Sequence, residues 1–335
     1  RHVMKKLLND ASKFVDEMLD GLCLAHPEFY RRTAPGARII VRSDAPIKGK
    51  VAIVSGGGSG HLPIFTGYVG KGLLDGCAIG EVFSSPSVEQ IAETMRAVDG
   101  GVGVLRLYGN YGGDVMNFDM AGEMLEMEDI ASTTVLLADD VASAKPEEWQ
   151  KRRGVAGMVY AFKMAGAKAA TKANLAEVTR VAQKAADACR SMGAALTPCT
   201  VPLAGKPTFQ IADDEMEMGM GIHGEPGVWR GKLRTADQVA SEIMDKLLAD
   251  QPLAAGDKVS ILVNSLGATP PEELYVLYRY AATRLKDAGV SIVMPLVGRY
   301  ATSMEMAGIS FTICKLDGEL ESLLKAPAEC AFWKV

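Results

Sequence analysis

Residues 51–63 read VAIVSGGGSGHLP, and this stretch decides the fold class. It opens with the short apolar run Val51–Val54, typical of a buried strand, and the glycine cluster that follows at once predicts a loop. Beyond this stretch, expected strands alternate with expected helices, and this alternation predicts an α/β fold. Two further strands are expected at Val102–Tyr108 and Thr133–Ala138, with helices near Val88–Val98 and Phe118–Glu126.

The second half of the chain repeats this alternation after a long helix. Asn174–Met192 has apolar residues at helical spacing, with a cap at Asn174 and a stop at Gly193. The sequence therefore predicts two α/β domains, residues 4–190 and residues 191–335. The remaining expected elements are a loop-rich region from Leu196 to Gly231, a capped helix over Thr235–Leu248, a strand over Val259–Asn264, a helix from Thr269 to Gly289, and strands at Ser291–Val297 and Phe311–Leu316.

The composition is ordinary for a soluble globular protein. Hydrophobic residues make up 48% of the 335 residues and charged residues 23%. A net charge of -5 argues against a broad nucleic-acid-binding surface, and the short basic cluster Lys151–Arg153 is interpreted as a solvated helix end. No apolar run approaches the ~20 residues that a membrane-spanning helix needs. We expect neither nucleic acid nor membrane as a partner.

The cysteines and the first residues bear on location. The six cysteines form no CxxC pair and no zinc-like spacing, so we expect reduced structural thiols, no metal site and a cytoplasmic protein. No signal peptide is recognised before the first helix. Arg1–Val3 is expected to be a remnant of expression, with native sequence beginning at Met4.

Two of the four histidines lie among glycines, and these two are the candidates for chemistry. His61 ends the cluster GGGSGH, where backbone amides at the carboxyl end of a parallel strand can hold a polar ligand. The spacing matches neither a P-loop nor a dinucleotide-binding GxGxxG motif. A tight structural turn is the alternative interpretation. His26, beside Pro27, is interpreted as structural.

His223 lies in GIHGEPG, and its imidazole is a possible nucleophile toward an activated carbonyl. A structural histidine is the alternative, and Glu225 either orients the ring or is solvated. An acidic run nearby is interpreted mainly as a solvated face. Asp114 follows the strand Val102–Tyr108 and is expected on the same sheet edge as His61, where a carboxylate and an imidazole together can deprotonate a hydroxyl. A turn or helix cap is the alternative for Asp114. The acidic run comprises Asp213, Asp214, Glu215 and Glu217, and the pairs Asp139-Asp140 and Asn117/Asp119 are interpreted as caps and turns.

Together these stretches resemble the DhaK subunit of the dihydroxyacetone kinase family over essentially the whole chain. GIHGEPG is the most specific of the matching motifs, whereas the glycine cluster alone is not specific. The matches, in the family's order, are GGGSGH at Gly56–His61, NYGGDVMNF at Asn110–Phe118, RRGVAG at Arg152–Gly157, CTVP at Cys199–Pro202, GIHGEPG at Gly221–Gly227 and NSLGATP at Asn264–Pro270.

The resemblance implies two α/β domains with an interdomain substrate cleft, and a role for each candidate residue. His223 matches the histidine that adds to the substrate's keto carbon as a hemiaminal. His61 and Asp114 match the acid/base pair that contacts the substrate hydroxyls, with His61 as the expected general base. Gly58, Ser59 and Gly60 match the substrate-contacting loop, together with the position now held by Gly109.

Two departures from the family pattern concern the substrate. Leu62 stands where the family's GGGSGHEP has glutamate, and Gly109 stands where its KNYTGD has lysine. Their loss from one pocket removes opposite charges and is expected to create room. The GHLP and YGNYGGDVMNFDMA variants resemble the branch that acts on four-carbon ketoses such as erythrulose. The expected substrate is dihydroxyacetone or a tetrulose.

The resemblance also implies partners. No cofactor is expected on this chain, because it has neither a nucleotide motif nor the helical ATP-binding domain of fused relatives. We expect a DhaL-like subunit carrying ADP or ATP with Mg²⁺, with ATP or a DhaM-like phosphotransferase-system protein as the phosphoryl source, and a homodimer formed through the first domain. The alternatives are a non-catalytic ketose-binding coactivator and, disfavoured by its glycine spacing, a nicotinamide-dependent oxidoreductase.

Overall fold

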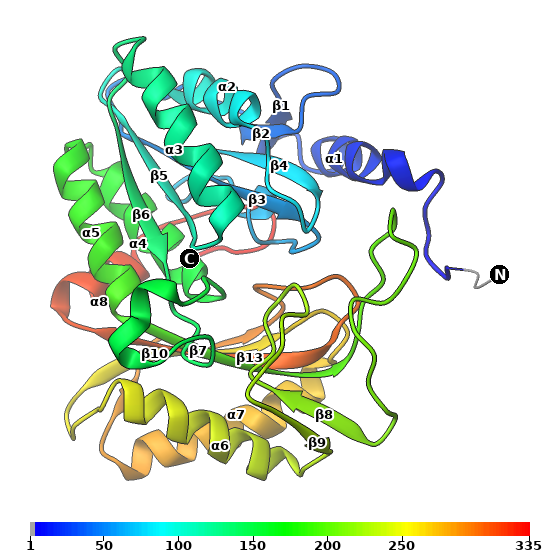
Figure 1. Cartoon of the computed structure of the whole chain (residues 1–335). Helices are drawn as coiled ribbons and strands as arrows, with labels where there is room; N and C mark the ends of the chain where they lie inside the picture. The colour runs from blue at the N-terminus through cyan, green and yellow to red at the C-terminus, as the bar shows by residue number, and fades with distance from the viewer. Residues whose placement is uncertain (1–3) are drawn as a thin grey trace.

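Two β-sheets organise the chain, one above the other in Figure 1, and the computed structural model describes residues 4–335. The predicted expression remnant at Arg1–Val3 lies outside the described residues. The first sheet has the order β1-β2-β4-β3-β5-β6, in which β4, β3, β5 and β6 are parallel and β1 and β2 form an antiparallel edge. Its strands are β1 (Tyr30–Arg32), β2 (Ile39–Arg42), β3 (Ala52–Ser59), β4 (Gly76–Val82), β5 (Val104–Gly109) and β6 (Ser132–Leu137).

Alternating residues of the first sheet pack against helices on its two faces. Ala52 and Val54 of β3 join a cluster with α2 (Val88–Val98) and α3 (Gly112–Glu126), whereas Ile53 faces α4 (Gly157–Ala170). The same face as Ile53 also carries α1 (Phe14–Ala25) and α5 (Leu175–Asp187) in its cluster. The first sheet is therefore covered on both faces, as parallel sheets require.

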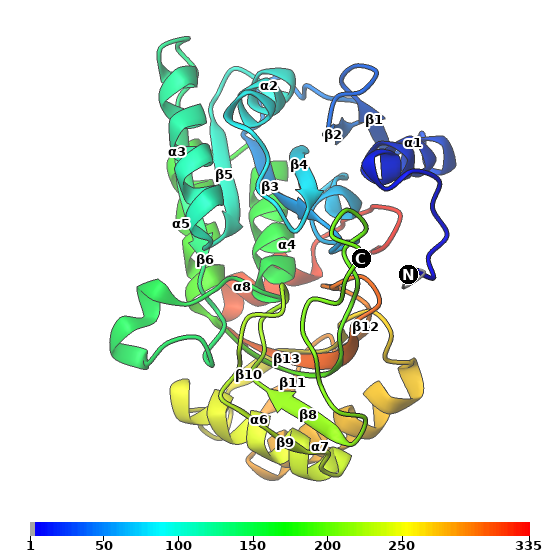
Figure 2. The ribbon, with the colours of Figure 1, turned by 45° about the vertical axis from the view of Figure 1, so that its right-hand side comes forward.

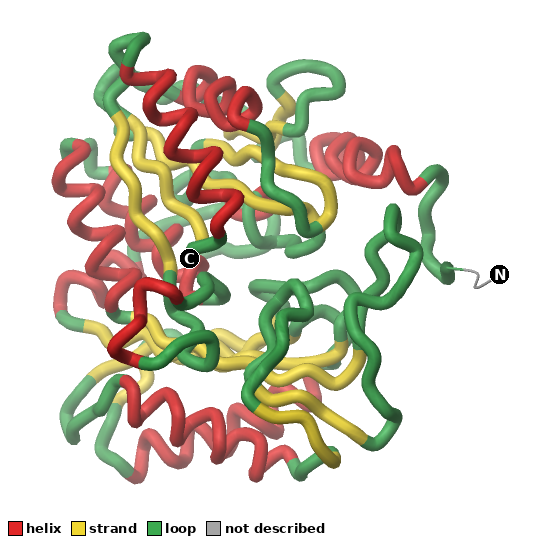
Figure 3. Tube along the Cα trace, viewed as in Figure 1, coloured by secondary structure: helices red, strands yellow, loops and turns green. Residues whose placement is uncertain are grey.

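The second sheet is mainly antiparallel, with the order β11-β10-β13-β7-β8-β9 and β12 also paired to β10. Figure 2 shows α6 (Ala236–Asp250) and α7 (Pro271–Asp287) on the side of this sheet away from α4. Figure 3 shows the long loop between β7 and β8. The strands are β7 (Cys189–Thr197), β8 (Glu215–Met218), β9 (Trp229–Lys232), β10 (Lys258–Ser265), β11 (Ser291–Ile292), β12 (Leu296–Gly298) and β13 (Ala307–Leu316), and α8 (Gly318–Lys325) follows β13.

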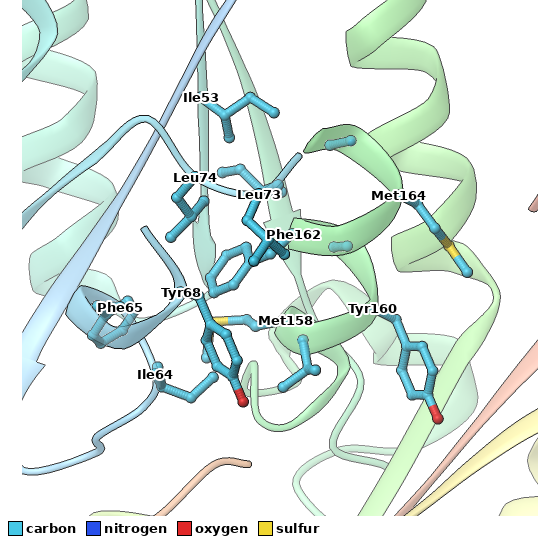
Figure 4. Packing of buried hydrophobic residues seen from close by; sticks show 14 of the residues in the cluster. Ile53, Ile64, Phe65, Tyr68, Leu73, Leu74, Met158, Tyr160, Phe162 and Met164 are labelled. Carbon is cyan, nitrogen blue, oxygen red and sulfur yellow. The ribbon is translucent and has the colours of Figure 1, made fainter. Parts of the chain in front are cut away.

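The helix α4 lies between the two sheets and is buried almost throughout. Figure 4 shows Met158 and Phe162 on the side of α4 that packs against Tyr68 and Leu73, while Tyr160 points the other way. The Tyr160 hydroxyl is 2.7 Å from Ser260 Oγ on β10. A helix that is apolar all round is one that has partners on every side, and here those partners are the two sheets.

The predicted α/β fold is confirmed, with three local corrections. The glycines 56–58 belong to β3 and not to a loop, because their missing side chains let neighbouring chain segments approach the strand. The predicted helix to Met192 ends at Asp187, and Met192 and Gly193 lie in β7. The predicted strand over Ser291–Val297 is two short strands. The predicted domain boundary near residue 190 lies where the second sheet begins, and it stays a prediction.

Lys151 is exposed as predicted, but the prediction of a solvated helix end is wrong for Arg152 and Arg153, which form ion pairs, and the Asp139-Asp140 pair does more than cap a turn. Arg152 is buried and pairs with Asp250 at 2.7 Å, and Arg153 pairs with Asp140 at 2.9 Å. The Asp139 carboxylate is buried as well and accepts three hydrogen bonds, two from the segment that leads into α4 and one from β7. The donors are the amides of Val155 (3.0 Å) and Gly157 (2.8 Å) and the Ser191 hydroxyl (2.6 Å).

None of the helices in residues 4–335 is long and apolar enough to cross a membrane. All six cysteines are free, and five of them are buried.

The Asp139 contacts give the first testable prediction. Asp139→Ala leaves two amides and a hydroxyl without their acceptor at the junction of the sheets, so the free energy of unfolding is expected to fall by at least about 2 kcal/mol. Equilibrium urea unfolding followed by tryptophan fluorescence measures this change. Asp213→Ala, at an exposed position, is the control, and equal stabilities of the two variants would contradict the assignment.

Candidate active site

The candidate site lies where β3, β4 and β5 end, at one edge of the first sheet. His61 follows β3, Phe83 and Ser85 follow β4, and Asp114 lies in the first turn of α3 just after β5. Because these strands are parallel, their carboxyl ends meet at the same edge, which is the usual place for a ligand in an open α/β sheet. The predicted placement of Asp114 and His61 on one edge is confirmed.

The glycine cluster is needed for close packing of two aromatic rings beside His61. A Cβ on Gly57 would lie 2.5 Å from the Phe65 ring, and one on Gly58 would lie 2.6 Å from the Phe83 Cα. Gly60 has φ +105° and lies against the Phe83 ring, so only glycine suits both its backbone and its surroundings. Phe83 itself has φ +58°, and its ring stacks on His61 at 5.0 Å between centroids.

The second histidine comes from the loop between β8 and β9. Glu217, at the end of β8, accepts from the Gly227 amide at 2.7 Å, and the Ser303 hydroxyl donates to the Ile222 carbonyl. Glu217 thus holds the far end of the His223 loop and does not contact the ring. Of the predicted acidic run it is the buried member, whereas Asp213 and Asp214 are exposed, in line with a solvated face.

His61 and His223, 162 positions apart, meet with their Nε2 atoms 3.0 Å apart. His61 Nδ1 lies 2.6 Å from the Thr302 carbonyl, which only accepts, so Nδ1 carries the proton. Burial, and after it the neighbouring His223 ring, lowers the pKa of His61 to about 3. The His61 ring is therefore neutral, its Nε2 is an acceptor, and the proton between the rings belongs to His223 Nε2.

Glu225 contacts His223 on the other side of its ring. Its Oε2 lies 3.4 Å from His223 Nδ1, and its Oε1 accepts from the His223 amide at 2.8 Å. The contacts with His223 lower the pKa of Glu225 to about 2 in spite of its burial. A carboxylate only accepts, and so does the unprotonated Nε2 of His61. The contact of His223 Nδ1 with Glu225 and the contact of His223 Nε2 with His61 are therefore both hydrogen bonds when each ring nitrogen of His223 carries a proton. Of the two interpretations of Glu225, the structure favours the orienting one.

Asp114 is 7% exposed, and its Oδ1 has no hydrogen-bond partner in the described part of the chain. Burial raises the pKa of Asp114, against smaller opposing effects of Ser85 and His223. A buried carboxylate oxygen without a donor is costly, so Oδ1 is an acceptor that is open to a donor from outside the chain. A raised pKa also brings this carboxylate closer to the range that suits a general base at neutral pH.

The other predicted substrate-binding residues lie close by, but not all are free to bind. The Ser59 hydroxyl donates to the Gly80 carbonyl at 2.7 Å, inside the sheet, and Gly58 is buried under Phe83. A side chain on Gly109 would meet the Tyr111 ring at 3.3 Å and the Met158 sulfur at 3.4 Å. The room expected from the absent lysine is therefore partly filled.

Leu62 faces a different space. It lines a groove of about 550 Å³ together with Ser59, Gly60, Phe14, Met18, Arg299 and Met304. A Cβ on Gly109 would instead face Tyr111 and Met158. The expectation that Leu62 and Gly109 alter one shared pocket stays a prediction.

Four contributors to the site were missed by the sequence analysis. Tyr111 lies edge-on to His223 at 4.9 Å between centroids, and it falls within a quoted motif, so its position was available. Phe83 and Ser85 follow a strand that had not been predicted. Thr302 acts through its carbonyl oxygen, for which no side-chain pattern exists.

The chain is similar to known proteins along almost its whole length. A protein-family model described as the Dak1 domain matches residues 20–332. The chain is 44% identical to the dihydroxyacetone-binding subunit DhaK of PTS-dependent dihydroxyacetone kinase 1 from Listeria innocua, over 98% of this chain and 100% of that one. It is also 44% identical to D-erythrulose kinase from Mycolicibacterium smegmatis, over 99% of this chain and 57% of that one.

Solved structures of a dihydroxyacetone kinase and of an operon co-activator share the fold of this chain. The dihydroxyacetone kinase from C. freundii in complex with AMP-PNP and Mg²⁺ gives a TM-score of 0.90 at 33% identity, over 99% of this chain and 61% of that one. The dihydroxyacetone kinase operon co-activator DhaQ gives a TM-score of 0.87 at 32% identity, over 95% and 98% of the two chains.

The tautomer assignment gives a second prediction. In the free protein, His61 is expected to stay neutral, with the proton on Nδ1, from pH 5 to 9, since its pKa is about 3 and the charge is lost above that pH. Nitrogen-15 NMR of histidine-labelled protein measures this, with His61→Asn and His26→Asn to assign the signals. A His61 ring that titrates near the ordinary histidine value, or that carries its proton on Nε2, would contradict the assignment.

Proposed function

This chain belongs to the Dak1 domain family of DhaK subunits, and on that premise we propose that it binds a short-chain ketose covalently through His223 for phosphorylation of a terminal hydroxyl. The names of the relatives combine a kinase with a short-chain ketose, and this supports both parts of the proposal. The single observation that carries the proposal is the meeting of His223 Nε2 with His61 Nε2 at 3.0 Å. Asp114, at the same sheet edge, supports it, because its buried Oδ1 has no hydrogen-bond partner among the described residues.

The covalent step follows from that contact. The His223 Nε2 proton passes to an acceptor, of which His61 Nε2 is the nearest, and the freed lone pair forms a bond to the keto carbon. The carbonyl π electrons move to the oxygen, which takes up the proton that left His223 Nε2 and becomes a hydroxyl, so that all atoms of the ketose and the ring are kept. Because His61 occupies the direction in which the carbon must approach, the two rings part before a ketose adds.

His61 and Asp114 then serve the hydroxyl that receives the phosphoryl group. Asp114 offers a buried acceptor with a raised pKa, and a neutral His61 offers a second acceptor. His61 is the base expected from the sequence, but Asp114 is the better candidate, because its pKa is raised whereas that of His61 is lowered. A fixed ketose also reduces phosphoryl transfer largely to positioning.

The substrate is a three- or four-carbon ketose. Covalent capture requires a keto carbon, so a polyol such as glycerol, which has none, is rejected. Similarity to dihydroxyacetone-binding subunits supports dihydroxyacetone, and equal identity to an erythrulose kinase supports a tetrulose. The absence of a lysine side chain at Gly109 removes one charged contact to a substrate hydroxyl.

The phosphoryl group comes from a partner. We expect a DhaL-like subunit that carries a nucleotide and Mg²⁺. The phosphoryl group itself would come from ATP or from a DhaM-like phosphotransferase protein, since a relative named PTS-dependent matches 98% of this chain. The complex with AMP-PNP and Mg²⁺ is of a longer chain, of which this one spans 61%. The homodimer and the cytoplasmic location belong to the same proposal.

A third prediction tests covalent capture. Native mass spectrometry of the full chain with excess dihydroxyacetone or erythrulose is expected to show a gain equal to the whole ketose, without loss of water, because addition to a carbonyl keeps all atoms. His223→Ala is expected to show no gain, and His26→Asn, remote from the site, to match wild type. An adduct that survives in His223→Ala would assign the bond to another residue.

A fourth prediction separates an enzyme from a coactivator, the alternative that similarity to DhaQ keeps open. With a DhaL partner and ATP, the chain is expected to phosphorylate a short ketose. His61→Asn and Asp114→Asn are expected to slow turnover by about 10²- to 10⁴-fold while the ketose still binds. No turnover on any C3 or C4 ketose with either donor system would favour the coactivator, and unchanged rates would remove these residues from acid/base work.

A further inference from the structure

A line of charged side chains runs from the edge of the first sheet to His223. Asp140, directly after β6 and Asp139, is 3% exposed and pairs with Arg153 through Nη2 at 2.9 Å and Nε at 3.0 Å. The same guanidinium donates to the Gly219 carbonyl at 3.3 Å, at the start of the His223 loop. Arg153 therefore joins the first sheet to the loop that carries the nucleophile.

The segment around Arg153 is held firmly by its own backbone. The Asp140 amide donates to the Arg153 carbonyl at 3.0 Å, and the Arg153 amide donates to the Ser143 hydroxyl at 3.0 Å. That hydroxyl donates in turn to the Asp140 carbonyl at 2.7 Å. Fixed at both its backbone and its guanidinium, Arg153 presents its remaining nitrogen, Nη1, in one direction.

That direction is toward Glu225, past Gly221. A Cβ on Gly221 would lie 2.6 Å from Arg153 Nη1 and 2.6 Å from Glu225 Oε1. The two charged groups thus share the space that a side chain at position 221 would fill. Attraction to Arg153 also contributes to the low pKa of Glu225.

We propose that Arg153, anchored by Asp140, is a positioning residue for the nucleophile: it keeps Glu225 charged and in place, and Glu225 holds the His223 ring by Nδ1. With the proton kept on Nδ1, the nitrogen that can attack a carbonyl is Nε2, the one that faces His61. In residues 4–335, the Arg153 guanidinium binds Asp140 and the Gly219 carbonyl and makes no hydrogen bond to the His223 ring. This inference rests on the proposed function, since it gives Arg153 a part in the same covalent step.

The test uses three variants of the full chain. Arg153→Met removes the charge, Arg153→Lys keeps it without the planar fork, and Gly221→Ala separates the two charged groups while leaving both in the chain. Lys151→Met is the matched control, because Lys151 is a neighbouring cation that is exposed and pairs only with Glu148. Ketose Kd by adduct titration, and nitrogen-15 signals of His223 in the free protein, are the two measurements.

Arg153→Met and Gly221→Ala are expected to weaken ketose binding by about tenfold or more, with the nitrogen-15 signals of His223 displaced from their wild-type positions. Arg153→Lys is expected to lie between, and Lys151→Met to match wild type. A purely structural role for Arg153 would lower the melting temperature without moving the His223 signals.

The inference is overturned if Arg153→Met keeps both the wild-type Kd and the wild-type His223 signals, or if Gly221→Ala does so should Arg153→Met fail to fold. Failure of the proposed function looks different. If wild type itself forms no adduct, covalent capture is wrong, and the His223 signals of the free variants still decide whether Arg153 controls the ring.

Discussion

The contact between the Nε2 atoms of His61 and His223 is the interaction on which the rest of the site depends. It joins a strand end of the first sheet to a loop of the second, and it fixes which nitrogen carries each proton. The Thr302 carbonyl binds Nδ1 of His61, and Glu225 faces Nδ1 of His223. The two Nε2 atoms are therefore left to share one proton. The proposed nucleophile and its proton acceptor are thereby held in contact.

The fold supplies this arrangement through α4 and its flanking segments. The helix packs between both sheets, and the segment that leads into it contains the buried Asp139, Asp140 and Arg152 and the partly buried Arg153. Asp139, Arg152 and Arg153 bind Ser191, Asp250 and the Gly219 carbonyl, respectively, and Asp140 anchors Arg153. The position of His223 relative to His61 is thus set by buried charge pairs and not by apolar packing alone. Breaking such a pair is costly, because the remaining charge stays buried.

The sequence was sufficient for the fold class and for the placement of His61 and Asp114 at one sheet edge, and the reasons are physical. Strand and helix alternation is a local pattern, and His61 and Asp114 follow neighbouring parallel strands, so topology alone brings them to one edge. The ion pairs of Arg152 and Arg153 were not predictable, since a run of basic residues resembles a solvated helix end until its partners, Asp250 and Asp140, are known. The inclusion of the glycines in β3 escaped prediction for a similar reason, because Phe65 and Phe83 reach them through tertiary packing. The role of Thr302 rests on a main-chain oxygen, which any residue possesses.

The central claim is that a ketone carbon bonds to one particular nitrogen, and heteronuclear NMR observes that bond directly. With protein labelled with nitrogen-15 at histidine and a ketose labelled with carbon-13 at its keto carbon, the account predicts that the carbonyl signal gives way to a tetrahedral carbon signal split by a one-bond coupling to His223 Nε2. A carbonyl signal that persists when the site is saturated, or a coupling that remains in His223→Ala, would contradict it.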